Sequence, residues 1–135
     1  YELARGCDLV LVGVGATGPE AELVTTGMLE PAEMAAIARA GGVGEMLGHF
    51  FDAAGRPGDT DLTRRVLTQP LEVLRGRRIV AVAGGAVKVR ALRAALASGL
   101  LSGLVTDERT ARAIVDASRG EGGDARAVPE LAVTP

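Results

Sequence analysis

Hydrophobic residues in this chain gather in short runs that end at glycine-rich turns. One apolar run lies within residues 8–13, a second spans residues 79–83, and a shorter third covers residues 104–105. Short apolar runs without a polar alternation are typical of strands that are buried on both faces of a parallel sheet. The pattern therefore predicts three buried strands.

Helical patterns separate these runs. Pro31 opens a segment that places Met34 and Ile37 on one face and ends at Gly41-Gly42, as expected for a helix with proline in its first turn. Residues 20–30 are mixed and predict irregular structure, and residues 43–51 fit either a helical stripe or a bent strand. The other predicted helices span residues 71–74, 86–98 and 108–117, the last with Asp107 as its N-cap.

The order of strands and helices predicts a parallel α/β sheet covered by helices. Residues 1–117 form the folded part, and residues 118–135, rich in Gly, Ala and Asp, are expected to be a mobile tail. The 135 residues fit one small domain. The chain starts at Tyr1 and leads almost directly into a strand, so we expect it to be a piece of a longer protein.

Composition narrows the classes of function. With no Trp, one Tyr and two Phe, a stacking platform for single-stranded nucleic acid is not expected, and a net charge of −2 argues against a DNA-binding surface within these residues. One Cys and one His cannot form a disulfide or an ordinary zinc site, which fits a reducing cytosol and predicts no metal or other cofactor. Cys7, just before a strand, is expected to fill the core. No apolar stretch is long enough to span a membrane.

Lys88 is the only lysine, whereas the other fourteen basic residues are arginine. Lysine is a compact point charge that can bind an anion or act as a nucleophile. It follows Gly84-Gly85 at the point where an apolar run gives way to a helical pattern. This context favours a functional lysine over a chance occurrence.

Three loops are predicted at the carboxyl ends of the strands, where ligands bind in open parallel sheets. They are Gly13-Val14-Gly15, Gly84-Gly85 through Lys88, and Thr106-Asp107-Glu108. Glycines that precede a helix allow backbone N–H groups to contact a phosphate. The same glycines would also suit a tight strand-to-helix turn, and Asp107 would suit a helix cap.

Two further acidic residues have both a functional and a structural interpretation. Glu45 lies between glycine-rich stretches, where it could accept hydrogen bonds from sugar hydroxyls or simply be a surface carboxylate. Asp52 could line a pocket or start a turn.

Taken together, the ordered motifs resemble the effector domain of the SorC family of bacterial transcriptional regulators, over about residues 2–117. The motifs in this chain are Asp8-Leu9-Val10-Leu11-Val12-Gly13-Val14-Gly15-Ala16, Gly41-Gly42-Val43-Gly44-Glu45, Phe50-Phe51-Asp52, Gly55-Arg56-Pro57, Leu71-Glu72-Val73-Leu74, Val80-Ala81-Val82-Ala83-Gly84-Gly85-x-x-Lys88 and Thr106-Asp107-Glu108-x-x-Ala111. The stretch from Thr17 to Met28 matches no part of the pattern.

The resemblance implies a three-layer, mostly parallel open sheet like that of ribose-5-phosphate isomerase and glucosamine-6-phosphate deaminase. It implies that residues 1–117 are the C-terminal half of the domain, and that an N-terminal helix-turn-helix outside this chain contacts operator DNA. A phosphorylated sugar would be the effector of a cytoplasmic homo-oligomer. By position, Lys88 matches a phosphate-contacting lysine and Glu45 a ligand-contacting acid. Gly13, Gly15 and Asp52 match positions around the site.

Two functions therefore follow as hypotheses. The first is a sensor of a sugar phosphate that has no enzymatic activity, with Gly13, Gly15, Glu45, Asp52, Gly84, Gly85 and Lys88 as the ligand-binding residues. The alternative is a sugar-phosphate isomerase or deaminase on the same fold, which would need a base close to the substrate carbon.

Overall fold

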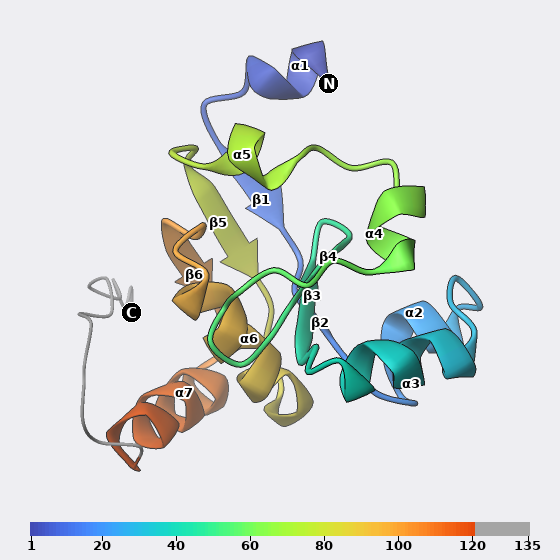
Figure 1. Ribbon diagram of the computed structural model, residues 1–135. Helices are drawn as coiled ribbons and strands as arrows, with labels where there is room; N and C mark the ends of the chain where they lie inside the picture. Colours follow the sequence, from blue (N-terminus) through green and yellow to red (C-terminus); the bar gives the residue numbers. More distant parts are fainter. Residues whose placement is uncertain (121–135) are drawn as a thin grey trace.

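The computed structural model describes residues 1–120 and contains seven α-helices, one 3-10 helix and six short strands in that range (Figure 1). In chain order they are α1 Glu2–Arg5, β1 Val10–Val12, β2 Gly15–Ala16, α2 Glu22–Thr25, α3 Pro31–Arg39, β3 Gly44–Met46, β4 His49–Phe51, α4 Asp61–Arg65, α5 Leu71–Leu74, β5 Ile79–Val82, η1 Ala86–Lys88, α6 Val89–Ala97, β6 Gly103–Val105 and α7 Glu108–Gly120.

The three predicted strands form one parallel sheet, in the order β1-β5-β6. Val12 pairs with Ala81, and Ala81 pairs with Leu104 on its other side. The parallel α/β architecture predicted from the sequence is therefore confirmed. A second, antiparallel sheet of order β2-β3-β4 was not predicted.

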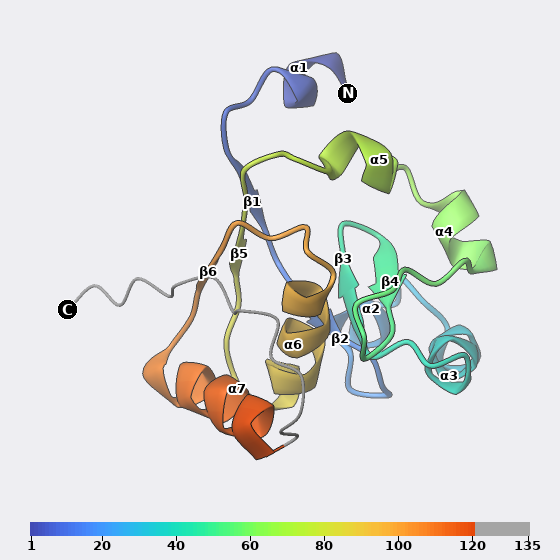
Figure 2. The ribbon, with the colours of Figure 1, turned by 60° about the vertical axis from the view of Figure 1, so that its left-hand side comes forward.

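Helix α6 lies between the two sheets (Figure 2). Its buried residues Ala91, Leu92, Ala94 and Ala95 belong to the main core, together with residues of both sheets. The approach to β3 is so close that a Cβ on Gly44 would lie 2.9 Å from the Cα and Cβ of Ala91. Only glycine fits there, so this contact fixes the distance between α6 and the antiparallel sheet.

Residues 43–51, which the sequence left open between helix and strand, form a β-hairpin. Leu47 and Gly48 connect β3 to β4 with φ values of 55° and 78°, and two positive φ angles are the mark of the type I′ turn that suits a two-residue hairpin. All three residues of β4 are buried. A strand without an exposed side has no polar alternation, which explains why the hydrophobic pattern did not identify it.

Several boundaries differ from the predictions. Residues 20–30 contain α2 rather than only irregular structure, and α4 was not predicted. The helix expected over residues 86–98 begins as the 3-10 turn η1 before α6. Helix α7 continues to Gly120, so residues 118–120 are helical, and the rest of the expected tail lies outside the described residues.

The sequence predicts helices on both faces of the parallel sheet, but the outer face of the sheet is exposed. Leu11, Val82 and Val105 expose 64%, 50% and 56% of their surface, whereas Val12, Ile79 and Ala81 on the inner face are buried. The sheet is thus closed by the core on one side and apolar but exposed on the other.

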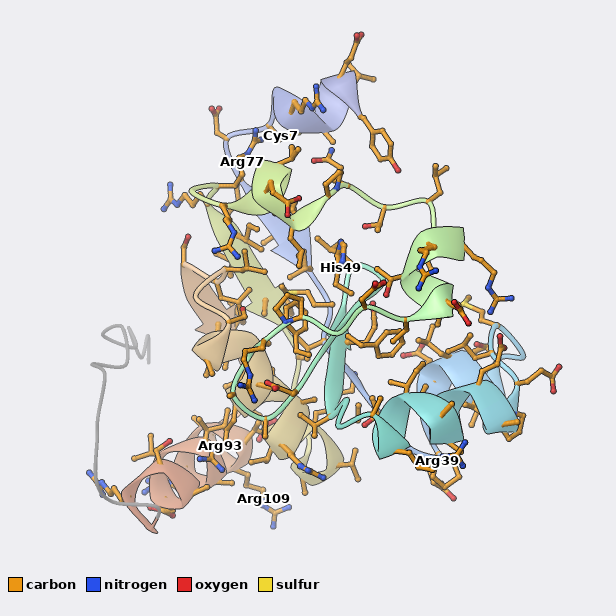
Figure 3. All side chains as sticks on the ribbon, in the orientation of Figure 1. Cys7, Arg39, His49, Arg77, Arg93 and Arg109 are labelled. Carbon is orange, nitrogen blue, oxygen red and sulfur yellow. The ribbon has the colours of Figure 1, made fainter. Side chains whose placement is uncertain are left out.

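The N-terminal helix α1 extends from the top of the molecule and is held by Arg77 (Figure 3). The Arg77 guanidinium donates hydrogen bonds to the carbonyl oxygens of Ala4, Arg5 and Cys7, at 3.1, 2.7 and 2.6 Å. Cys7 itself is exposed, so its predicted place in the core is wrong. The reason is that the strand begins only at Val10, and Cys7 still belongs to the connection from α1.

Asp107 caps helix α7, as predicted. Its Oδ1 accepts a hydrogen bond from the backbone N of Thr110 at 2.9 Å, and its Oδ2 accepts one from the Thr110 hydroxyl at 2.6 Å. These bonds hold the pKa of the Asp107 carboxyl below its usual range, and the bond from the Thr110 side chain has the largest effect. None of the helices within residues 1–120 is long and apolar enough to cross a membrane.

The substitution Gly44→Ala is expected to destabilise the fold by about 1–3 kcal/mol, because the new methyl group would overlap the Ala91 backbone. Gly13→Ala is the matched control, since a Cβ there meets nothing within 4 Å. Chemical denaturation of both variants measures the difference. Equal stability of the two variants would show that the α6–β3 contact is not tight.

The substitution Asp107→Ala is expected to lower the melting temperature at neutral pH, because α7 loses its cap. The folded-state pKa of Asp107 is lowered, so its stabilisation is present above the ordinary aspartate pKa and is lost as the pH falls through the folded value. Asp116→Ala on the same helix is the control. Melting curves that stay equally separated from wild type at neutral and at strongly acidic pH would contradict this role of the carboxylate.

Candidate functional site

A cavity of about 300 Å³ opens where β1 ends, between the antiparallel sheet and η1. This volume is at the lower end of the range for small-molecule sites. Its lining residues are Gly13, Val14, Gly15, Ala16, Glu22, Leu23, Thr26, Met28, Glu45, Leu47 and Lys88. Four of the predicted ligand-binding residues are among them: Gly13, Gly15, Glu45 and Lys88.

Lys88 is the last residue of η1 and the N-cap of α6. Its backbone N donates a hydrogen bond to the carbonyl of Gly85 at 3.0 Å, which fixes the turn that leads out of β5. The side chain is half-buried and lines the cavity. Within the described part of the chain the Lys88 ammonium has no hydrogen-bond or salt-bridge partner, so its charge is available to a ligand.

Glu45 is the central residue of β3 and pairs with Gly15 of β2. Its Oε1 accepts a hydrogen bond from the backbone N of Gly48 at 2.5 Å. Its Oε2 is 3.0 Å from the position that a Cβ of residue 15 would occupy, so a glycine at that position leaves room for the carboxylate. Burial raises the pKa of Glu45, while the Gly48 hydrogen bond and the charges of His49 and Lys88 act in the opposite direction.

Gly84 and Gly85 do not line the cavity but shape the turn before Lys88. The backbone N of Gly85 donates a hydrogen bond to the Thr110 hydroxyl at 2.8 Å, and a Cβ on Gly84 would collide with the carboxylate of Asp107. This turn is therefore held by the first residues of α7. The two glycines position the lysine through the backbone, which is the strand-to-helix interpretation that the sequence left open.

Asp52 is also outside the cavity lining. Its Oδ1 accepts hydrogen bonds from the backbone N of Ala54 and of Arg56, each at 2.9 Å, and its Oδ2 accepts one from Arg56 Nε at 2.8 Å. These bonds lower the pKa of the Asp52 carboxyl, and the bond from the Arg56 backbone has the largest effect. Asp52 thus stabilises the loop after β4, and the structure does not bring it together with Lys88.

The cavity wall opposite the predicted residues comes from α2 and the turn after it, which carry Glu22, Thr26 and Met28. The Thr26 hydroxyl donates a hydrogen bond to the Glu22 carbonyl at 2.6 Å. Buried Ala21 and Leu29 anchor the two ends of this segment in a second core cluster. Sequence reasoning missed this wall because a four-residue helix has no detectable periodicity.

His49, labelled in Figure 3, is buried and is not among the residues that line the cavity. Its Nε2 lies 2.9 Å from the carbonyl oxygen of Gln69, a geometry in which Nε2 carries the proton. The ring therefore ties β4 to the segment before α5. Residues 1–120 contain no group of three or more His, Cys, Asp or Glu side chains that could hold a metal ion.

Comparison with known proteins places these features in a family. Residues 1–116 match the family described as "Putative sugar-binding domain". The chain is 51% identical over 121 residues to the erythritol catabolism regulatory protein EryD of Brucella abortus, and 39% identical over 116 residues to the transcriptional regulator LsrR of Klebsiella pneumoniae. These alignments cover 90% and 83% of this chain but only 38% and 36% of the two relatives, so the chain spans little more than a third of their length.

Solved structures share the fold. A DeoR family transcriptional regulator from Listeria monocytogenes superposes with a TM-score of 0.78 at 29% identity, over 84% of this chain and 46% of the other. The full-length sorbitol operon regulator SorC from Klebsiella pneumoniae has a TM-score of 0.71 at 23% identity, over 82% of this chain and 36% of SorC, and supports the fold alone. The chain therefore belongs to the sugar-binding domain family whose relatives are bacterial transcriptional regulators, as its resemblance to the SorC family predicts.

Proposed function

We propose that this chain is the C-terminal half of the effector domain of a transcriptional regulator, and that its cavity binds a phosphorylated sugar or polyol. The observation that carries the proposal is the Lys88 ammonium, which lines the cavity without an ion-pair partner among the described residues. A lysine in such a position attracts an anion as a point charge. The positive end of the α6 dipole, whose N-cap is Lys88, adds to this attraction.

The remaining lining residues suit the other end of such a ligand. Glu22 carries carboxylate oxygens that accept hydrogen bonds from hydroxyl groups, Glu45 offers its Oε2 as a hydrogen-bonding atom, and Leu47 and Met28 supply apolar contact. The name of EryD, the erythritol catabolism regulatory protein, points to a four-carbon polyol. Phosphorylated erythritol is therefore the first ligand to test.

The proposal extends to the whole protein. Operator DNA would be contacted by a helix-turn-helix outside this chain, in a homo-oligomer that acts in the cytoplasm. Ligand binding would change DNA binding by favouring one arrangement of the protomers, because a ligand shifts an equilibrium only through its different affinities for the two states. No cofactor is needed for this role.

The sensor role is favoured over a sugar-phosphate isomerase or deaminase on the same fold. By their names, the relatives EryD and LsrR are regulatory proteins. Isomerisation needs a base next to the reacting carbon, supported by groups that relay its proton. The described lining residues include the carboxylates of Glu22 and Glu45 but no histidine, and the ring of His49, on the strand next to Glu45, is bonded to the Gln69 carbonyl.

The substitution Lys88→Ala in the intact protein is expected to weaken binding of phosphorylated erythritol by about 10- to 150-fold, the loss of one charge-assisted contact worth about 1.5–3 kcal/mol. Titration calorimetry measures the change. Binding of unphosphorylated erythritol is expected to be nearly unaffected.

Arg90→Ala is the matched control, because Arg90 is an exposed cation two residues away that does not line the cavity. It removes the same charge from the same helix start. Unchanged affinity for phosphorylated erythritol in Lys88→Ala, or an equal loss in both variants, would contradict the proposed contact.

A further inference from the structure

The charged side chains of the cavity do not by themselves suit a phosphate. The described lining residues include one cation, Lys88, and two carboxylates, Glu22 and Glu45. A phosphate monoester carries close to two negative charges at neutral pH. If both carboxylates stayed ionised, the site would hold about four negative charges around one ammonium. A phosphate site at Lys88 therefore requires that one of the two carboxylates becomes neutral.

Glu45 is the carboxylate that can take up a proton. Glu22 is exposed on α2 and remains hydrated, whereas Glu45 is half-buried between β2 and β4. Its Oε1 is occupied by the Gly48 N–H at 2.5 Å, and its Oε2, beside Gly15, has no hydrogen-bond donor among the described residues. Oε2 is therefore the atom on which a proton would reside.

The charge of Glu45 depends on Lys88. Burial disfavours the ionised carboxyl, and Lys88 is one of the two basic side chains that favour it. The other is His49 on the adjacent strand, whose Nε2–H is already bonded to the Gln69 carbonyl. The neighbouring β2 contributes Gly15 and Ala16, and the buried residues of α6 are three alanines and Leu92, so none of these residues titrates. Among the described lining residues, Glu22 is the one charged group besides Lys88 that faces Glu45 across the cavity, and it has the same sign as Glu45.

We propose that binding of a phosphate group at Lys88 is coupled to uptake of one proton by Glu45 Oε2, so that the site takes up ligand and proton together. The proton comes from solvent, an O–H bond forms at Oε2, and no other covalent bond changes. The inference rests on the proposed function, because it presumes that Lys88 receives the phosphate.

The reason is electrostatic. A cavity of about 300 Å³ is roughly 8 Å across, so a phosphate beside Lys88 cannot avoid the field of Glu45. The ligand cancels the attraction that Lys88 exerts on the carboxylate and adds repulsion of its own, and both changes favour the neutral acid. A protonated Oε2 can also donate a hydrogen bond to the ligand, which an ionised carboxylate cannot do.

The sign of the pH dependence follows from this. Because the complex binds one proton more than the free site, affinity is highest below the pKa of Glu45 in the free site and is lost as the pH rises from there through the pKa of Glu45 in the complex. One coupled proton gives at most a tenfold loss of affinity per pH unit. The phosphate itself gains a proton near pH 6, so the test belongs between about pH 7 and pH 8.5.

Titration calorimetry of the intact protein, in buffers of different ionisation enthalpy, counts the protons taken up directly. With phosphorylated erythritol as the probe we expect proton uptake per bound ligand and a loss of affinity of about three- to tenfold per pH unit. With unphosphorylated erythritol, which leaves the charge of Lys88 in place, we expect no uptake.

Glu45→Gln is the matched variant, since it preserves the shape of the side chain and the Gly48 hydrogen bond but cannot titrate. It should abolish the proton uptake and remove the fall of affinity between about pH 7 and pH 8.5, whatever its affinity at a single pH. Tight binding of phosphorylated erythritol with no uptake, or with the same uptake in Glu45→Gln, overturns this inference and leaves the proposed function standing. Absence of binding by both phosphorylated erythritol and inorganic phosphate at every pH overturns the proposed function, and the inference with it.

Discussion

The contact between Gly44 and Ala91 sets the geometry on which the site depends. It allows α6 to lie directly against β3, closer than any residue with a Cβ at position 44 would permit. Glu45 is the next residue of β3, and Lys88 immediately precedes α6. A backbone contact between two glycine- and alanine-rich segments thus brings the acidic and the basic group of the cavity to the same place.

The electrostatics of the cavity follow from that placement. A half-buried carboxylate is costly unless charge or hydrogen bonds compensate it, and Glu45 receives the Gly48 N–H and the field of Lys88. Lys88 in turn has no salt bridge within the described residues, and the first turn of α7 holds the backbone turn before Lys88 through the Thr110 hydroxyl. Because α7 holds the backbone turn and the Lys88 ammonium has no salt bridge, the site can respond to an anion.

The sequence predicted the parts whose signals are local. The strands β1 and β5 and the helix that begins at Pro31 were identified because an apolar run or a helical period extends over four or more residues, and β6 was identified from the short apolar run at residues 104–105. The singular Lys88 stood out by composition. The antiparallel hairpin was left undecided, since its strands have three residues each and β4 is buried on both sides. The cavity wall formed by α2 depends on tertiary packing, which the residue pattern does not show. Asp52 stabilises its loop through local hydrogen bonds, and its position in the sequence is equally compatible with a place in a pocket.

The central claim is directly measurable at the side chain of Lys88, the only lysine among these 135 residues. In a sample of the chain's intact protein labelled with ¹³C and ¹⁵N on lysine, the Lys88 signal can be assigned by its loss in Lys88→Arg. The account predicts that the Lys88 Cε and Nζ resonances shift saturably with phosphorylated erythritol and much less with erythritol. Resonances that remain unchanged when calorimetry shows the site to be filled would contradict it.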